Sequence, residues 1–329
     1  MKSLTDAPVE LELLRTTNLT MVGITIGDPS GIGPEIVLRA ISLKGLLIDK
    51  FIIIGNRKLL EKLQKKIAKY SVQSLTRCKV LDAFDYFDYE FGKPQKKCGL
   101  ASLLQLHLAI HLLKIGKIKS IVTAPVSKTA LSLVGFLFPG QTEYFASEFG
   151  INKYGMLAWS KELKIILSTI HKPLKDVPNL ITKQNILEKI ILLNSYLKHY
   201  EKIKRPRIGV FSLNPHSFEF TCGAEHRILL AIKQAQKLGI NVDGPIPADS
   251  IFVNRSISKA KNGYVAMYHD QAMLPVKLLS QGTGVNVTLG LPFIRTSPLH
   301  GVAYDIAGKG IASPLAMYNA IKLCQKLSD

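Results

Sequence analysis

The sequence has few cysteines and no long apolar run, and each shortage excludes a class of protein. Four cysteines in 329 residues, none in C-x-x-C spacing, cannot build a disulfide scaffold, so we expect reduced, mostly buried thiols in a cytoplasmic protein. No run of about 18 uninterrupted apolar residues occurs, so we expect no membrane span. Residues 1–19 contain acidic residues and no apolar stretch. They are expected to form a variable leader and not a signal peptide.

Acidic residues are also scarce relative to basic ones. Lysine and arginine number 43 against 24 aspartates and glutamates, a net charge of +19. Such a charge suits nucleic acid, membrane surfaces or small anions. The basic residues are spread out, without an arginine-rich arm or a basic stretch interleaved with aromatics, so we expect no nucleic-acid partner. Attraction of small phosphorylated or carboxylated molecules fits the charge.

Short apolar runs alternate with helical patterns along the chain. This alternation predicts an α/β protein with a largely parallel sheet, and the length is comfortable for two domains. The runs are apolar without alternation, which indicates strands buried on both faces. Strands are expected at 22–26, 51–55, 120–124, 156–159, 164–169, 207–213, 264–267 and 285–289, and helices from 34 and at 103–117, 181–200, 224–238 and 312–327.

Five polar clusters follow directly after predicted strands. In open α/β sheets, ligands bind at the carboxyl ends of the strands, so five clusters in this position indicate one shared site. The clusters are Gly27–Glu35, Ala124–Lys128, His171, Asn214–His216 and His269–Asp270.

Three of these clusters contain a histidine. His171, His216 and His269 could together bind a divalent metal, since three imidazoles form a common catalytic ligand set. No local spacing motif supports that interpretation, and a structural or hydrogen-bonding role is favoured for each histidine taken alone. His107 and His111 lie four residues apart on a helix, but their leucine-rich surroundings favour packing.

Two glycine-rich segments could wrap a ligand. The segment 25–35, TIGDPSGIGPE, lies between a strand and a helix, where glycines allow close approach to an anion. Its spacing matches neither G-x-G-x-x-G nor a P-loop. The segment 307–310, AGKG, could wrap a nucleotide or form a tight turn. Ser127 and Lys128 are adjacent, which disfavours a catalytic serine–lysine pair.

The segment 268–295 concentrates polar groups among apolar and small residues. It contains His269, Asp270, Lys277, Asn286 and Arg295. The histidine can bind metal or move a proton, and the lysine and arginine suit an anionic ligand.

With these residues in view, the chain resembles the 4-hydroxythreonine-4-phosphate dehydrogenase family. Its ends also resemble the broader isocitrate and isopropylmalate dehydrogenase superfamily. The family motifs run in order from about residue 22 to 320 and read GDPSGIGPE, TAPVSK, GQTEYFA, IHKPLKDVP, LNPHS, GPIPADSIF, YHDQ, VNVTLGLPFIRTS and HGVAYDIAGKG.

The resemblance implies a two-domain α/β fold that is not a Rossmann fold, with the active site in an interdomain cleft of a homodimer. We expect a cofactor-side domain from 20–127 plus 290–329, and a metal-binding and dimerisation domain from 128–289. The family activity is NAD- or NADP-dependent oxidation of 4-phosphooxy-L-threonine, followed by decarboxylation, in pyridoxal 5'-phosphate synthesis.

The resemblance also implies roles for individual residues. One zinc, magnesium or cobalt ion would be held by His171, His216 and His269, one of them supplied by the partner subunit. Asp249, Asp270 and Lys277 are the catalytic candidates. Substrate contacts are expected from Gln141, Thr142, Lys277, Asn286 and Arg295, and cofactor contacts from His300, Gly301, Asp305, Ala307, Gly308 and Lys309.

One departure from the family pattern bears on the substrate. Gln141 stands where the family has a histidine that touches substrate, and glutamine cannot carry charge. A related phosphorylated threonate or sugar acid is therefore an alternative substrate. A non-catalytic basic binding protein is the alternative of another class, which the intact histidines disfavour.

Overall fold

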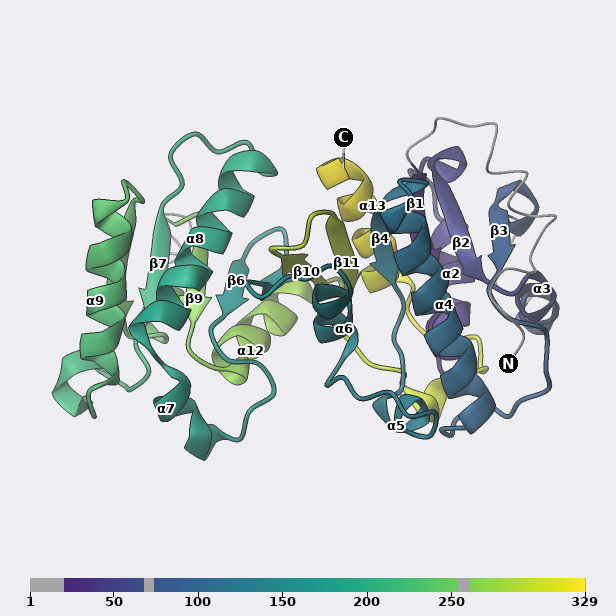
Figure 1. The fold of residues 1–329 in the computed structure, drawn as a ribbon, viewed down its shortest axis with the longest axis horizontal. Coiled ribbons are helices and arrows are strands. Elements are labelled where there is room, and N and C mark those ends of the chain that lie inside the picture. The colour runs from purple at the N-terminus through teal and green to yellow at the C-terminus, as the bar shows by residue number, and fades with distance from the viewer. Residues whose placement is uncertain (1–20, 68–73, 254–260, 329) are drawn as a thin grey trace. The chain divides into compact units, whose positions relative to one another are not determined.

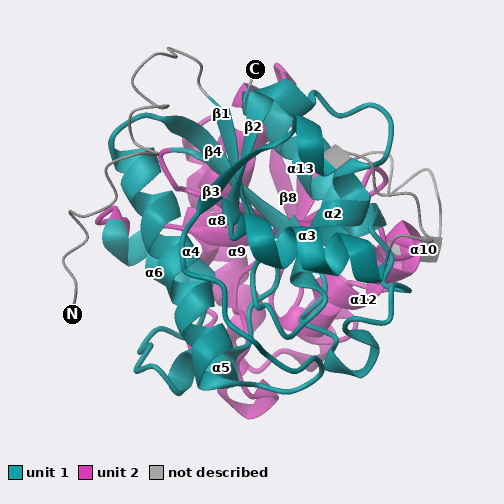
Figure 2. Ribbon diagram, turned by 90° about the vertical axis from the view of Figure 1, so that its right-hand side faces the viewer, with its two compact units in different colours: residues 1–148, 293–329 teal, residues 149–292 magenta. Residues whose placement is uncertain are grey.

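The computed structural model describes residues 21–67, 74–253 and 261–328. The expected leader at 1–19 lies outside them. The chain forms two compact units, residues 1–148 with 293–329 and residues 149–292 (Figure 2). The domain boundaries expected from the sequence stay a prediction. No helix in the described part of the chain is long and apolar enough to cross a membrane.

The first unit is built on a parallel sheet with strand order β3-β2-β1-β4-β11, in which every neighbouring pair is parallel (Figure 1). β1, β2 and β11 are buried throughout, as expected for strands covered on both faces. Its strands are β1 (Met21–Thr25), β2 (Phe51–Gly55), β3 (Lys79–Asp82), β4 (Ile118–Thr123) and β11 (Ile294–Pro298). Its helices are α2 (Gly33–Ile41), α3 (Arg57–Lys66), α4 (Lys96–Lys114), α5 (Lys128–Ser132), α6 (Gln141–Glu148) and α13 (Leu315–Ser328), with short 3-10 turns η1 (Ile48–Lys50), η3 (Ser74–Arg77) and η6 (Tyr304–Ile306).

The second unit has a mixed sheet with strand order β10-β5-β6-β9-β7-β8. β5 runs antiparallel to both of its neighbours, and the four strands from β6 to β8 are parallel. Its strands are β5 (Gly155–Trp159), β6 (Lys164–Leu167), β7 (Ile208–Phe211), β8 (Val242–Ile246), β9 (Gly263–Ala266) and β10 (Val285–Leu289). Its helices are α7 (Val177–Leu180), α8 (Lys183–His199), α9 (Ala224–Lys237), α10 (Ser250–Val253) and α12 (His269–Ser280), with 3-10 turns η4 (Leu174–Asp176) and η5 (Ser217–Phe220).

The predicted fold class, an α/β protein with largely parallel sheets, is confirmed. The predicted strands and helices are present, with ends that shift by a few residues. The largest shift is at α4, which begins at Lys96 where the pattern predicted 103. Gly99 weakens the helical pattern there. A Cβ at this position would lie 1.9 Å from the carbonyl oxygen of Ala130, so close packing against α5 requires the glycine.

The sequence pattern missed three elements that position candidate site residues, namely α6 with Gln141 and Thr142, α12 with Lys277, and β11 with Arg295. α12 contains Pro275, which removes a backbone donor and obscures a helical pattern. β11 is a buried strand with the sequence IRTSP, whose polar residues do not resemble a core strand. The expectation of free, mostly buried cysteines is confirmed, since only Cys222 is exposed.

Candidate functional site

Three adjacent parallel strands of the second unit end beside the histidines predicted to bind metal. β6, β9 and β7 are neighbours in the sheet, and Leu167 at the end of β6 pairs with Ala266 at the end of β9. His171 follows β6, His269 follows β9 and His216 follows β7. Because adjacent parallel strands end at the same edge of a sheet, the topology brings these three loops together.

Side-chain hydrogen bonds join the three strand ends to one another. The hydroxyl of Thr169 donates to the carbonyl oxygen of Met267 at 2.7 Å, which ties the β6 end to the β9 end. Gln271 accepts from the backbone N–H of Met267 and donates to the carbonyl oxygen of Ser212, both at 2.9 Å. The loops that carry the histidines are therefore fixed relative to each other by neutral hydrogen bonds.

Two of the three histidines lie close together. The ring centroids of His171 and His269 are 5.4 Å apart, and the rings are inclined by 38°. His171 and His216 both adopt left-handed backbone conformations, with φ of 49° and 53°. Such conformations are uncommon for residues other than glycine and concentrate at functional sites. No three histidine, cysteine, aspartate or glutamate side chains within the described residues form a metal-binding group.

His269 begins α12 and contacts the next residue. Its Nδ1 lies 2.7 Å from Oδ1 of Asp270, whose side chain is exposed. A carboxylate bound to one imidazole nitrogen orients the ring and leaves Nε2 available to a ligand. The imidazoles of His171 and His269 could therefore serve as two ligands of a divalent cation, with Asp270 orienting the ring of His269. A third ligand would complete a catalytic set.

A buried glutamate on α9 holds the loop that contains His216. Glu225 accepts from the backbone N–H of Asn214 at 2.9 Å, from its side-chain amide and from the hydroxyl of Thr221. Burial raises the pKa of Glu225, but these hydrogen bonds outweigh that effect and lower its pKa below the ordinary value. Glu225 therefore acts as an ionised anchor for Asn214, which lies two residues before His216.

The remaining candidates of this unit lie on different elements. Lys277 is exposed on α12, eight residues after His269, which is about 12 Å along the helix axis. Asp249 is exposed in the loop between β8 and α10. Asn286 lies on β10, and its Oδ1 is buried without a hydrogen-bond partner within the described residues. An unsatisfied buried acceptor is costly, so this atom suits a donor group of a ligand.

In the first unit, Arg295 on β11 forms a polar cluster with the predicted substrate residues of α6. The Arg295 guanidinium donates to the hydroxyls of Thr142 and Thr123, both at 2.9 Å, and to Oε1 of Gln141 at 3.4 Å. Its Cζ lies 5.5 Å from the ring centroid of Phe145. Three of the predicted substrate residues, Gln141, Thr142 and Arg295, are thus brought together.

Arg295 is a buried cation, with an exposure of 3%. Burial lowers its pKa to about 10, partly offset by the nearby Glu143 carboxylate. The side chain therefore remains charged at neutral pH. The bonds to Thr123, Thr142 and Gln141 hold it through neutral oxygens, which orient the cation without cancelling its charge.

The predicted cofactor residues form a glycine-rich loop in the same unit. Ala307 and Gly308 are buried, while the side chains of Asp305 and Lys309 are exposed. Gly308 has a φ of 72°, and a Cβ there would lie 2.6 Å from the ring of Phe91. Nearby, Nδ1 of the half-buried His300 lies 3.1 Å from the carbonyl oxygen of Gly301. Glycine is required at position 308 because the backbone packs closely against the Phe91 ring in a left-handed conformation.

A family model described as pyridoxal phosphate biosynthetic protein PdxA matches residues 48–324. The chain belongs to this family. The membership predicted from the motifs is confirmed, since this model and relatives named 4-hydroxythreonine-4-phosphate dehydrogenase both match most of the chain.

Known members of the PdxA family share this length and fold. The chain is 40% identical to a 4-hydroxythreonine-4-phosphate dehydrogenase of Sulfurihydrogenibium, which covers 93% of this chain and 97% of the relative. It is 38% identical to a provisionally named D-threonate 4-phosphate dehydrogenase of Oceanobacillus iheyensis, with 92% and 96% covered. The crystal structure of the 4-hydroxythreonine-4-phosphate dehydrogenase of Klebsiella pneumoniae superimposes with a TM-score of 0.82 at 31% identity, with 94% and 100% covered.

Sequence reasoning missed several residues that hold the site together in this PdxA family member. Thr123 lies at the end of a strand as an ordinary β-branched residue, and Phe145 reads as core. Glu225 carries no sequence signal beyond its place in the first turn of a helix. Gln271 lies inside the YHDQ motif, so the motif itself could have indicated it.

Proposed function

We propose that this chain oxidises 4-phosphooxy-L-threonine to 2-amino-3-oxo-4-phosphooxybutanoate with NAD or NADP. The product then decarboxylates to 3-amino-2-oxopropyl phosphate in pyridoxal 5'-phosphate biosynthesis. The observation that carries the proposal is membership of the PdxA family together with 40% identity to a dehydrogenase named for this substrate, over 97% of that relative.

The proposed anion-binding group is Arg295 with Thr142. A buried guanidinium held by neutral oxygens keeps its full charge for a phosphate or carboxylate, and low exposure strengthens that attraction. Gln141 can add a hydrogen bond but no charge. Lys277, some two turns along α12 from His269, would reach a second anionic group of the substrate.

The proposed metal ligands are His171, His216 and His269, one of them supplied by the partner copy in a homodimer. The close approach of the His171 and His269 rings and the Asp270 carboxylate on His269 support this pair as ligands. When bound, a divalent zinc, magnesium or cobalt ion supplies Lewis acidity toward the substrate hydroxyl and toward charge that develops during decarboxylation.

The chain's own groups would then orient the substrate and move its protons. Asp270 is engaged by His269, which favours an orienting role, and Asp249 is the proposed proton acceptor for the substrate hydroxyl. The buried Oδ1 of Asn286 would accept a hydrogen bond from the substrate amine or hydroxyl.

The proposed cofactor loop extends from His300 to Lys309. Ala307 and Gly308 are buried, with Gly308 packed against the Phe91 ring, so they would contact a nucleotide through backbone groups alone. The exposed Gly301, Asp305 and Lys309 offer further polar contacts. NAD and NADP both remain candidates for this loop.

A second substrate is favoured by two observations, the 38% identity to the Oceanobacillus protein and the neutral Gln141. A phosphorylated threonate differs from the first substrate in lacking the amine. The purified protein should be assayed with 4-phosphooxy-L-threonine and with phosphorylated threonate, each with NAD and NADP, while the nicotinamide absorbance is followed. Turnover of the amino acid alone supports the first proposal, and turnover of the threonate alone refutes it.

Metal dependence has its own test. We expect His216→Ala to abolish turnover while the protein remains folded, and His199→Ala, an exposed histidine on α8, to have no effect. Lys277→Ala should mainly raise the substrate KM. Full activity in His216→Ala after chelation would refute the three-histidine site.

A further inference from the structure

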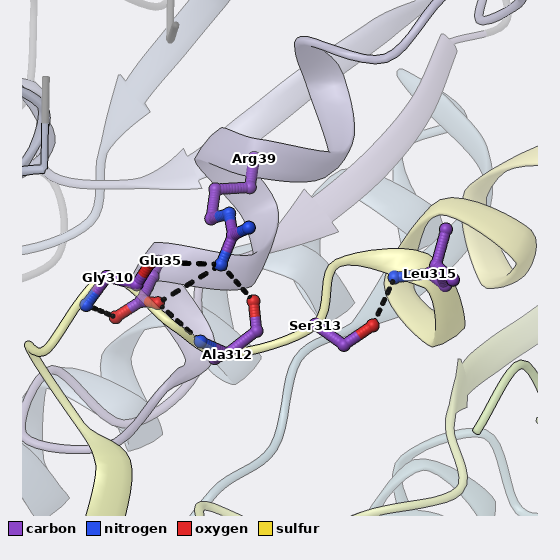
Figure 3. A network of polar contacts seen from close by, with 6 residues as sticks. All are labelled: Glu35, Arg39, Gly310, Ala312, Ser313 and Leu315. Carbon is purple, nitrogen blue, oxygen red and sulfur yellow. Dashed lines mark hydrogen bonds and ion pairs between the residues drawn. The ribbon is translucent and has the colours of Figure 1, made fainter. Parts of the chain in front are cut away.

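Glu35 and Arg39 of α2 form hydrogen bonds with the backbone of residues 310–312, directly after the proposed cofactor loop (Figure 3). Glu35 is 1% exposed, and its two carboxylate oxygens accept from the backbone N–H groups of Gly310 at 3.2 Å and Ala312 at 2.9 Å. Arg39, one turn further along α2, donates to the carbonyl oxygens of the same two residues. Its Nη1 also lies 3.7 Å from Oε1 of Glu35. Both backbone groups of Gly310 and of Ala312 are therefore bound by one ion pair.

The other end of the loop is bound to the segment just before α2. The Tyr304 hydroxyl donates to Oδ2 of Asp28 at 2.7 Å, and Asp28 is fully buried. The backbone N–H of Ile32 donates to the carbonyl oxygen of Val302 at 2.9 Å. The five residues 305–309 thus lie between two anchors that both belong to residues 28–39.

This double anchoring matters because the loop is intrinsically loose. Gly308 and Gly310 both have a φ of 72°, and glycine loses more conformational freedom on ordering than any other residue. When a loop becomes ordered only as its ligand binds, the entropy cost of ordering weakens the affinity for the ligand. A loop that is already ordered avoids this cost. A buried ion pair is by itself weak support for stability, so a geometric role accounts better for burying Glu35.

We propose that Glu35 and Arg39 are positioning residues that hold residues 305–309 in the conformation that binds the nicotinamide cofactor. The inference rests on the proposed function, in which Ala307, Gly308 and Lys309 contact NAD or NADP. Neither Glu35 nor Arg39 needs to touch the cofactor. They act through the backbone of Gly310 and Ala312, and their loss weakens cofactor binding while the chemical step is preserved.

A purely structural role predicts something different. Residues 310–312 lead directly into α13, whose first residue, Leu315, donates its backbone N–H to the Ser313 hydroxyl at 3.4 Å (Figure 3). If the ion pair only secured α13, its loss would lower the melting temperature and the amount of active enzyme. The KM for the cofactor would then be unchanged.

The test compares Glu35→Gln with Glu61→Gln. Glu61 also pairs with an arginine four residues away on a helix, Arg57 at 4.0 Å, but that pair is exposed. A glutamine at position 35 keeps the shape but replaces one acceptor oxygen with a donor. We expect the KM and Kd for NAD to rise about tenfold, since hydrogen bonds to a charged acceptor are lost. The kcat and the KM for 4-phosphooxy-L-threonine should stay close to the wild-type values, and Glu61→Gln should change none of these constants.

Arg39→Lys is the second variant. The contacts of Arg39 with Gly310, Ala312 and Glu35 come from Nη1, so a lysine keeps the charge but changes the position of the donor, and it should give a smaller rise in the KM for NAD. It decides the matter alone if Glu35→Gln does not fold. Hydrogen–deuterium exchange of the peptide over 304–312 should be faster in both variants. If the wild type oxidises no phosphorylated substrate with NAD or NADP, the proposed function is wrong and this inference falls with it. If the wild type is active and the folded variants keep its KM for NAD, only the positioning role is refuted.

Discussion

Replacing Arg295 with methionine should separate the stability of this protein from its activity. Methionine keeps much of the length of the arginine stem and its contact with the Phe145 ring, but it removes the charge and the donors. We expect a folded protein of nearly wild-type stability that has lost most of its affinity for a phosphorylated substrate.

The magnitude follows from two opposing terms. Burial lowers the pKa of Arg295 to about 10, which at 1.36 kcal/mol per pH unit corresponds to a cost of about 3 kcal/mol for the charged form. Because the folded pKa is below the unfolded one, this cost is fully present at neutral pH. The hydrogen bonds to Thr123 and Thr142, both 2.9 Å, return about 3 kcal/mol. The terms nearly cancel, so the free energy of unfolding should change by no more than about 1 kcal/mol.

Urea denaturation would measure the first effect and steady-state kinetics the second. Losing a charge-assisted contact to a phosphate or carboxylate should lower kcat/KM about a hundredfold. Arg57→Met is the control, because Arg57 is a half-exposed arginine on α3 with a 4.0 Å ion pair. It should leave both the unfolding free energy and kcat/KM near their wild-type values.

Two results would contradict this reasoning. A loss of about 3 kcal/mol or more in Arg295→Met would mean that the hydrogen bonds outweigh the buried charge, and that the residue is chiefly structural. An unchanged kcat/KM in a folded variant would mean that Arg295 does not contact the substrate.

Three further predictions follow from the same structure. Glu225→Gln should destabilise the protein by about 1–2 kcal/mol at pH 7 and raise the Kd for the metal, as calorimetry would show. Since the folded pKa of Glu225 is below 4.5, its contribution to stability is present above pH 4.5 and disappears as the pH falls through the folded pKa. A difference in unfolding free energy between wild type and Glu225→Gln that grows in acid would be incompatible with this. Gly308 and Gly116 both have left-handed φ values, 72° and 71°, but only Gly308 faces the Phe91 ring. Gly308→Ala should therefore lower the free energy of unfolding more than Gly116→Ala does, and only Gly308→Ala should raise the KM for NAD. Equal Tm values for the two variants would show that Phe91 moves aside. Chelation should abolish turnover, and zinc, magnesium or cobalt should restore it, whereas activity that survives exhaustive chelation would exclude a metal-assisted step.

The strand-end clusters could be predicted from the chain because they depend on local order in the sequence. β6 and β9 are apolar strands, and ligands bind beyond the carboxyl ends of such strands, so His171 and His269 stand out in the segments that follow them without a structure. The family motifs add the family and its expected chemistry.

The arrangement of those clusters depends on strand order, which the sequence pattern does not contain. That β6, β9 and β7 are neighbours, so that His171 and His269 come within 5.4 Å, results from crossover connections of many residues. The burial of Arg295 depends on a strand too polar to be recognised as one.

Local sequence alone is enough to indicate which residue types follow the strands, because apolar burial and backbone sterics act over a few residues. Only the tertiary structure decided which loops are tied together. Glu35 and Ala312 are 277 residues apart in the chain, and no local pattern can encode a hydrogen bond that exists only after the sheet has formed.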